Sequence, residues 1–156
     1  MYARILLAVD GSSTSNAALR HAAGLVSDAR ARLRVVHVVD SPYDYPDVMF
    51  GHVAGDLDDL RAAWQKAGEE ILDGARAALR RGGIEPEVAL LETAGRRVSV
   101  AIADEARRWG ADLIVIGTHG RRGLDRLLLG SVAEGVARTA PTAVLLVRGT
   151  APDDRP

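Results

Sequence analysis

The chain has 156 residues, of which 47% are apolar and 26% are charged, a composition typical of a globular domain with one hydrophobic core. Its formal net charge is −1, so no overall basic field would attract nucleic acid or an anionic membrane. The chain has no cysteine. This excludes disulfides, thiolate metal sites and cysteine nucleophiles, and it fits a reducing compartment.

The amino-terminal segment does not resemble an export signal. Residues Ile5 to Val9 are apolar, but Asp10 interrupts the run, which is shorter than a secretory signal core. No apolar run in the sequence approaches the roughly 18 residues needed to cross a bilayer. We therefore expect a cytoplasmic protein without a membrane partner.

Short apolar runs alternate with longer amphipathic stretches along the chain. Near-continuous apolar runs are typical of strands covered on both faces, and the stretches between them have helical periodicity. In chain order we predict strand Ile5–Val9, helix Asn16–Asp28, strand Leu33–Val39, helix Leu57–Arg81, strand Val88–Leu91, helix Val98–Trp109, strand Leu113–Ile116, helix Ser131–Thr139 and strand Ala143–Val147. This alternation predicts an α/β fold: an open, doubly wound, parallel five-stranded sheet with helices on both faces.

We predict a single domain over residues 1–148. The stretch Asp40–Gly55 contains two prolines and two glycines and is predicted to be a mobile surface loop. The polar, proline-bearing tail over residues 149–156 is predicted to be disordered.

A glycine-rich segment follows the fourth predicted strand. It begins at Gly117, includes Gly120, and leads to Gly130 and Ser131 at the start of the last helix. In an open parallel sheet, ligands bind beyond the carboxyl ends of the strands. Glycines there let the backbone approach a ligand, and amides at a helix start bind phosphate oxygens. The alternative is purely structural, because Ser131 and Glu134 have the spacing of a capping box.

The same residues carry a family resemblance. Gly117 and Gly120 are separated by two residues, and nine more precede Gly130–Ser131. This spacing resembles the nucleotide-binding signature of the universal stress protein family. The similarity continues in the first strand, which ends at Asp10, and covers most of residues 1–148. The resemblance implies a flavodoxin-like, Rossmann-like sheet of order 3-2-1-4-5 and, for the branch with this motif, ATP binding.

The resemblance also implies a set of nucleotide contacts. Ala8 and the backbone of Val38 would line the adenine, and Asp10 would bond a ribose hydroxyl or lie near Mg²⁺ carried by the nucleotide. Ile116 and Gly117 would pack against the nucleoside. The phosphates would be held by Gly120, Gly130, Ser131 and Val132.

Other nucleotide signatures and catalytic constellations are absent from the sequence. There is no phosphate loop ending in lysine and serine or threonine, and no nucleophile elbow. The four histidines, His21, His37, His52 and His119, lack metal-ligand spacing. Trp64 and Trp109 are expected to be packing residues.

The favoured hypothesis is an ATP-binding, nucleotide-responsive dimer with a regulatory or protective role in stress response. The alternative is an enzyme, either a slow ATPase or a protein that phosphorylates itself. No evident general base supports the enzyme, so no catalytic residue is assigned. A nucleotide-free structural dimer is a third possibility, which the intact motif disfavours. The homodimer is expected to form through the strand 143–147, an apolar edge strand in the order 3-2-1-4-5.

Overall fold

The structure is a computed structural model that describes residues 2–29, 31–41, 57–119 and 129–149. Most of the loop predicted at Asp40–Gly55, residue Gly120 and nearly all of the predicted disordered tail lie outside the described residues. The elements are β1 (Arg4–Ala8), α1 (Ser13–Ala29), β2 (Arg32–Val39), α3 (Leu57–Arg81), β3 (Glu87–Glu92), α4 (Val98–Trp109), β4 (Leu113–Gly117), α5 (Ser131–Thr139) and β5 (Ala143–Val147).

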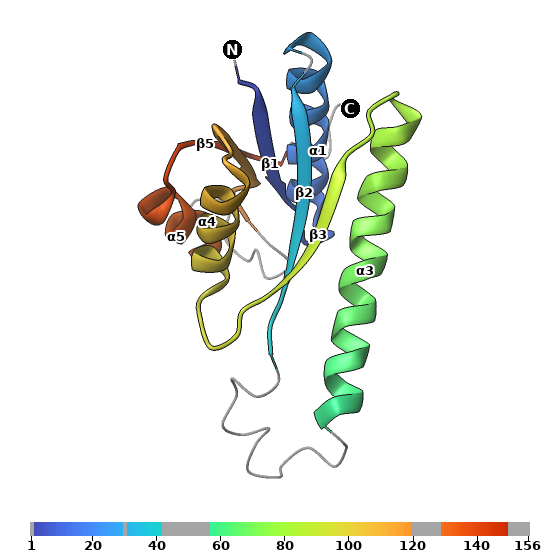
Figure 1. Cartoon of the computed structure of the whole chain (residues 1–156), viewed down its shortest axis with the longest axis vertical. Helices are drawn as coiled ribbons and strands as arrows, with labels where there is room; N and C mark the ends of the chain where they lie inside the picture. Colours follow the sequence, from blue (N-terminus) through green and yellow to red (C-terminus); the bar gives the residue numbers. More distant parts are fainter. Residues whose placement is uncertain (1, 30, 42–56, 120–128, 150–156) are drawn as a thin grey trace, which may run out of the picture.

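The five strands form one parallel sheet in the order β3-β2-β1-β4-β5, which confirms the predicted fold. The central strand β1 pairs on both sides, so that Ala8 has Val36 and Ile116 as its neighbours. Helices α1 and α3 cover one face of the sheet, and α4 and α5 cover the other (Figure 1). From β1 the chain moves to β2 and β3 on one side, and later to β4 and β5 on the other. Because each connection between parallel strands is right-handed, the two directions place their helices on opposite faces of the sheet.

The apolar runs are continuous because both faces of the central strands are buried. Ile5, Leu6 and Leu7 are all completely buried. Their side chains alternate: Ile5 and Leu7 belong to the core under α1 and α3, and Leu6 belongs to the core under α4 and α5. This alternation follows from the period of two along a strand.

Helix α1 begins three residues before the predicted start at Asn16, because Ser12 caps it. The Ser12 hydroxyl accepts a hydrogen bond from the N–H of Ser15 (3.2 Å), and the Ser12 carbonyl accepts from the N–H of Asn16 (3.0 Å). A serine in this position satisfies donors that the first turn leaves unpaired.

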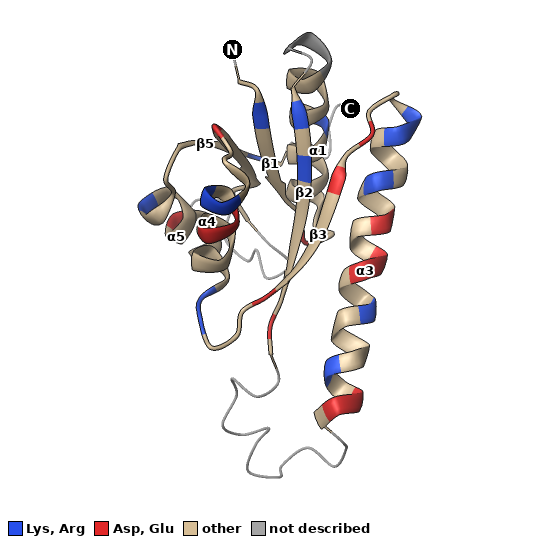
Figure 2. Cartoon of the chain, viewed as in Figure 1, with Lys and Arg blue, Asp and Glu red and all other residues tan. Residues whose placement is uncertain are grey.

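Helix α3 packs closely on the sheet at one glycine. A Cβ added to Gly68 would lie 2.7 Å from a methyl of Leu90 and 2.8 Å from one of Val39. Along the rest of this helix basic and acidic residues are interspersed (Figure 2), so the helix presents no surface of one charge.

Among the described residues, no helix is both long enough and apolar enough to cross a membrane.

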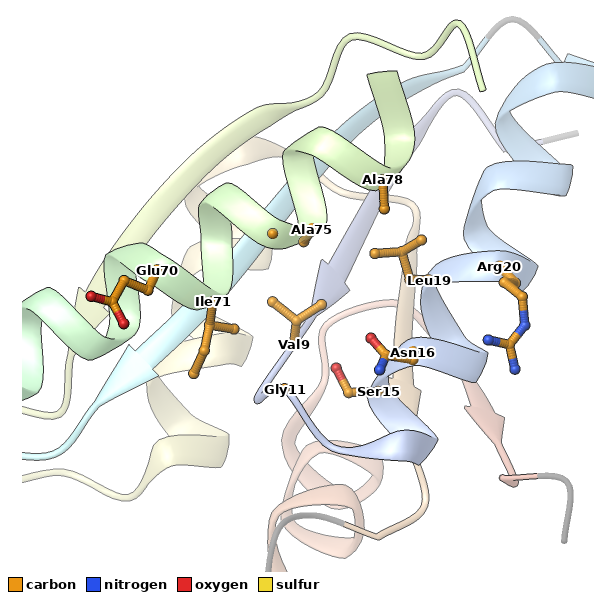
Figure 3. A pocket seen from close by; sticks show the side chains of 11 residues that line it. Val9, Gly11, Ser15, Asn16, Leu19, Arg20, Glu70, Ile71, Ala75 and Ala78 are labelled. Carbon is orange, nitrogen blue, oxygen red and sulfur yellow. The ribbon is translucent and has the colours of Figure 1, made fainter. Parts of the chain in front are cut away.

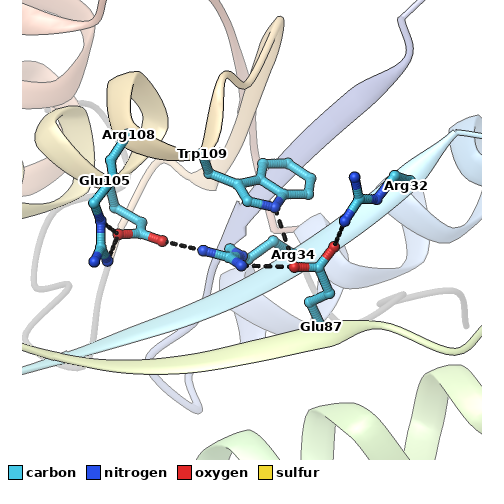
Figure 4. Close-up of polar contacts among 6 residues, drawn as sticks. All are labelled: Arg32, Arg34, Glu87, Glu105, Arg108 and Trp109. Carbon is cyan, nitrogen blue, oxygen red and sulfur yellow. Dashed lines mark hydrogen bonds and ion pairs between the residues drawn. The ribbon is translucent and has the colours of Figure 1, made fainter.

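The carboxyl end of α4 is tied to the sheet by a network of ion pairs around Trp109 (Figure 4). Arg34 bonds both Glu87 on β3 (2.6 Å) and the buried Glu105 on α4 (2.5 Å). The indole N–H of Trp109 donates to Glu87 (3.1 Å). The guanidinium of Arg4 lies 4.7 Å from the Trp109 ring centre, so cation–π attraction adds to the ion pairs. Trp109 is thus a packing residue, as predicted.

Candidate functional site

The winding direction of the sheet reverses between β1 and β4. The chain leaves β1 into α1 on one face and leaves β4 toward α5 on the opposite face. Ala8 and Ile116, near the carboxyl ends of these two strands, are register partners. Ligands of open parallel sheets bind at such a reversal point, so the candidate site lies here.

Four of the predicted contact residues meet in one apolar cluster beneath α4 and α5. Ala8 and Ile116 are buried members of that cluster, and Val38 and Val132 pack against it as half-buried residues. They come from β1, β2, β4 and α5. These four residues therefore share the core on the α4–α5 face of the sheet, close to the reversal point.

Asp10 lies two residues beyond the end of β1. One oxygen of its half-buried carboxylate accepts a hydrogen bond from the N–H of Ser12 (2.9 Å). Its backbone N–H donates to the Ser15 hydroxyl (3.2 Å). Within the described residues no group of three or more acidic or histidine side chains forms a metal cage.

The capping box, given above as the structural alternative for Ser131 and Glu134, does not form at the start of α5. Gly130 is the N-cap residue, with φ −62° and ψ 147°, and no side chain of a described residue caps it. Ser131 is instead the first helical residue and is exposed, while Glu134 forms an ion pair with Arg138 (2.5 Å). The first turn of α5 thus keeps amide donors without a side-chain acceptor, which favours an anion at this position.

Two glycines of the motif also have a structural reason to be glycine. A Cβ on Gly117 would lie 3.0–3.1 Å from backbone and side-chain atoms of Thr14 and Ser15, and a Cβ on Gly130 would lie 3.0 Å from the carbonyl oxygen of Thr118. Gly117 lets the first turn of α1 approach the end of β4, and Gly130 lets the chain turn into α5. Spacing of the glycines alone therefore does not distinguish packing from binding.

The sequence did not predict the hydrogen bonds that connect the loops after β1 and β4. The Thr14 hydroxyl donates to the carbonyl of His119 and lies 3.1 Å from the Ser12 hydroxyl. Thr118 is buried, and its hydroxyl lies 3.0 Å from Nδ1 of His119. The predicted pairing of the first and fourth strands could have indicated these contacts. It brings together the loops that follow the two strands, so that Thr14 and His119, 105 positions apart, lie side by side.

A groove lies on the opposite face of the sheet, between α1 and α3 (Figure 3). This groove encloses about 410 Å³ and is lined in part by Val9, Leu19 and Ile71, with Ser15, Arg20 and Glu70 around it. None of the predicted nucleotide contacts lines it. The reversal-point site therefore remains the candidate, on the grounds of topology and of the uncapped helix start.

The sequence model of the universal stress protein family matches residues 1–148. The chain belongs to this family. A universal stress protein of Methanocaldococcus jannaschii is 33% identical over 150 residues, which cover 95% of this chain and 83% of that protein. The resemblance on which the nucleotide contacts were predicted is thus confirmed at the level of the family.

Solved structures of this family share the fold. A universal stress protein from Burkholderia pseudomallei has a TM-score of 0.73 and 37% identity, covering 93% of this chain and 95% of that one. The universal stress protein of Archaeoglobus fulgidus in complex with dAMP has a TM-score of 0.66 and 28% identity, covering 94% and 98% of the two chains. Relatives with this fold therefore include one that binds an adenine nucleotide.

Proposed function

We propose that this universal stress protein binds ATP in the crevice between the ends of β1 and β4 and acts as a nucleotide-responsive homodimer with a regulatory or protective role in the cytoplasm. The observation that carries the proposal is the meeting of four apolar predicted contacts near the reversal point, with one of them in a helix start that lacks a side-chain cap. Apolar side chains suit an adenine base, and the helix start suits the charge of phosphates.

The predicted residues divide between the parts of ATP accordingly. Ala8, Val38 and Ile116 would contact the base, and Asp10 the ribose or a nucleotide-bound Mg²⁺, since its second carboxylate oxygen is not the acceptor of the Ser12 bond. Gly117 would flank the nucleoside. Gly120, Gly130, Ser131 and Val132 would surround the phosphates. The dAMP complex of the Archaeoglobus fulgidus relative supports the nucleotide class.

The sharpest test of this site changes one charge at the exposed Ser131. Ser131→Asp places a carboxylate where the phosphates would bind, but it also favours helix formation because an acidic residue suits the first turn. We expect at least a tenfold weaker Kd for ATP, equivalent to about 1.4 kcal/mol, with no loss of thermal stability.

Ser131→Asn is the matched control, since it has nearly the same shape without the charge. It should retain most of the ATP affinity in calorimetric titrations with MgCl₂. If Ser131→Asp binds ATP as tightly as the unmodified protein, the phosphates do not lie at the start of α5 and the site assignment is wrong.

A further inference from the structure

The peptide bond between Val9 and Asp10 is held by side chains at both its carbonyl and its N–H. Val9 is the first residue beyond β1, and its carbonyl oxygen lies 2.7 Å from Nδ1 of His37 on β2. The N–H of Asp10 donates to the hydroxyl of Ser15, a buried residue in the first turn of α1 (3.2 Å). Two neighbouring elements thus fix the peptide that leads into Asp10.

The bond to Val9 determines which nitrogen of His37 carries a proton. A carbonyl oxygen can only accept a hydrogen bond, so Nδ1 is the donor. The ring is half-buried and closely confined, since a Cβ added to Gly68 of α3 would lie 2.9 Å from its Cδ2. Because Gly68 has no side chain, the imidazole fits under α3 and reaches the end of β1.

The position of the Asp10 carboxylate depends on this peptide. One carboxylate oxygen accepts from the N–H of Ser12 (2.9 Å), and the direction of the side chain follows from the backbone that carries it. Asp10 is the acidic contact of the proposed site, for a ribose hydroxyl or for Mg²⁺ on the nucleotide. Such a contact needs a geometry held by supporting hydrogen bonds, because a small rotation of the peptide would displace the carboxylate.

We infer that His37 is a positioning residue for Asp10: its Nδ1–H holds the Val9 carbonyl and thereby fixes where the Asp10 carboxylate meets the nucleotide. His37 itself lies on the α3 side of the sheet and touches no part of the ligand. This inference rests on the proposed ATP site, and it adds to that site a residue of β2 that acts through the end of β1.

A double-mutant cycle separates this role from general support of the fold. His37→Leu removes the donor but keeps an apolar side chain of similar size, and Asp10→Ala removes the carboxylate. Calorimetry with ATP and MgCl₂ is carried out on both single variants, on the double variant and on the unmodified protein. We expect His37→Leu to weaken ATP binding about fivefold or more, and to weaken it less than about twofold when Asp10 is already alanine.

His37→Asn is the matched control, because its amide nitrogen can take the position of Nδ1 and donate to the Val9 carbonyl. It should bind ATP more tightly than His37→Leu. His37→Gln, whose amide lies nearer the position of Nε2, replaces His37→Leu if that variant does not fold.

Each result of the cycle has one meaning. Unchanged ATP affinity in His37→Leu would overturn the inference and leave the ATP site standing. An equal loss with and without the Asp10 carboxylate would show that His37 only supports the fold, and would also overturn it. If Asp10→Ala binds ATP as the unmodified protein does, Asp10 is not a contact and the inference fails. If the unmodified protein does not bind ATP, the proposed function fails as well.

NMR on the unmodified protein tests the hydrogen bond directly. The chain has four histidines, and long-range correlations between ring protons and nitrogens show which nitrogen of each is protonated. At about pH 8, where an ordinary histidine is neutral, we expect the proton of His37 on Nδ1 both with and without ATP. A proton on Nε2 instead would mean that the bond to Val9 is absent and the inference is wrong.

Discussion

At the scale of single residues, two helical glycines have opposite surroundings. A Cβ on Gly135 in α5 would lie 2.5 Å from the hydroxyl oxygen of Ser99, a buried residue of α4, whereas a Cβ on Gly74 in α3 would meet no atom within 4 Å. Gly135→Ala should therefore lower the free energy of unfolding by about 1–3 kcal/mol through overpacking. Gly74→Ala should raise it by about 0.5–1 kcal/mol, because alanine favours the helix.

Urea denaturation of the two variants and of the unmodified protein would test whether the free energy of unfolding falls in Gly135→Ala and rises in Gly74→Ala. The pair serves as its own control, since each variant makes the same chemical change in a helix. A Gly135→Ala protein as stable as the Gly74→Ala protein would mean that α4 and α5 pack less closely than the structure has them.

A second expectation at this scale concerns chemistry. Asp10 is the acid that the sequence places at the crevice, and one of its oxygens is held by the N–H of Ser12. The sequence offers no evident general base beside the phosphates, and no catalytic residue is assigned. We expect steady-state release of phosphate from ATP to be slower than about 1 s⁻¹, the lower end of typical enzyme turnover. Faster turnover that Asp10→Asn abolishes would favour the alternative of an ATPase.

At the scale of elements, the attachment of α4 to β2 and β3 should depend on pH. The hydrogen bond from Arg34 lowers the pKa of Glu87, and further bonds from Arg32 and Trp109 act in the same direction against the opposing effect of burial. A carboxyl whose pKa is lower in the folded state contributes stability above its unfolded pKa, near 4.3. That contribution is lost as the pH falls through the folded pKa.

Glu87→Gln should therefore be less stable than the unmodified protein at pH 7, and the difference should shrink as the pH falls below the ordinary pKa of glutamate toward the lowered pKa of Glu87 in the folded protein. Thermal denaturation between pH 3 and pH 7 measures this. Glu69→Gln, at an exposed position of α3, is the control and should show a much smaller difference at pH 7. A Glu87→Gln deficit that is constant over this range would contradict the assigned role of the charge.

Most elements could be predicted because their apolar residues recur with the period of a strand or a helix. The predicted and observed elements differ mainly in where each element begins and ends. In helices, the capping residues set these bounds. The serine cap at Ser12 is a recognisable signal that was overlooked. The capping box at Ser131, which was the structural alternative to phosphate binding, does not form, because Gly130 is the N-cap residue and Glu134 pairs with Arg138. A short sequence pattern does not specify which of two competing partners a side chain takes.

At the scale of the whole molecule, β5 is an edge strand of the sheet, and the proposed homodimer would form along it. The carbonyl of Val147 faces β4, where it accepts from Thr118. Because backbone groups of alternate residues point to opposite sides of a strand, Ala143 and Leu145 also face β4, and Val144 and Leu146 present theirs to the outside.

This alternation identifies Val144 as the residue at which to test the dimer. Val144→Pro removes an outward N–H and leaves the bonds to β4 in place, so it should convert the dimer to a folded monomer. Val144→Thr keeps the N–H and the branched side chain and should remain dimeric. Light scattering after size exclusion distinguishes the two states. An unmodified protein that is monomeric at tens of micromolar, with and without ATP, would end the dimer proposal.

The amino-acid sequence was enough to predict the fold class, and the family resemblance gave the strand order and the proposed region of the nucleotide site. This was possible because periodicity, glycine spacing and alternation of elements are local properties of the chain. Three features became visible in the folded chain alone: Gly117 is required by the approach of α1, three arginines surround Trp109, and His119 is joined to Thr14. These contacts join residues that are distant in the chain, and they exist only once parallel pairing has brought the strand ends together.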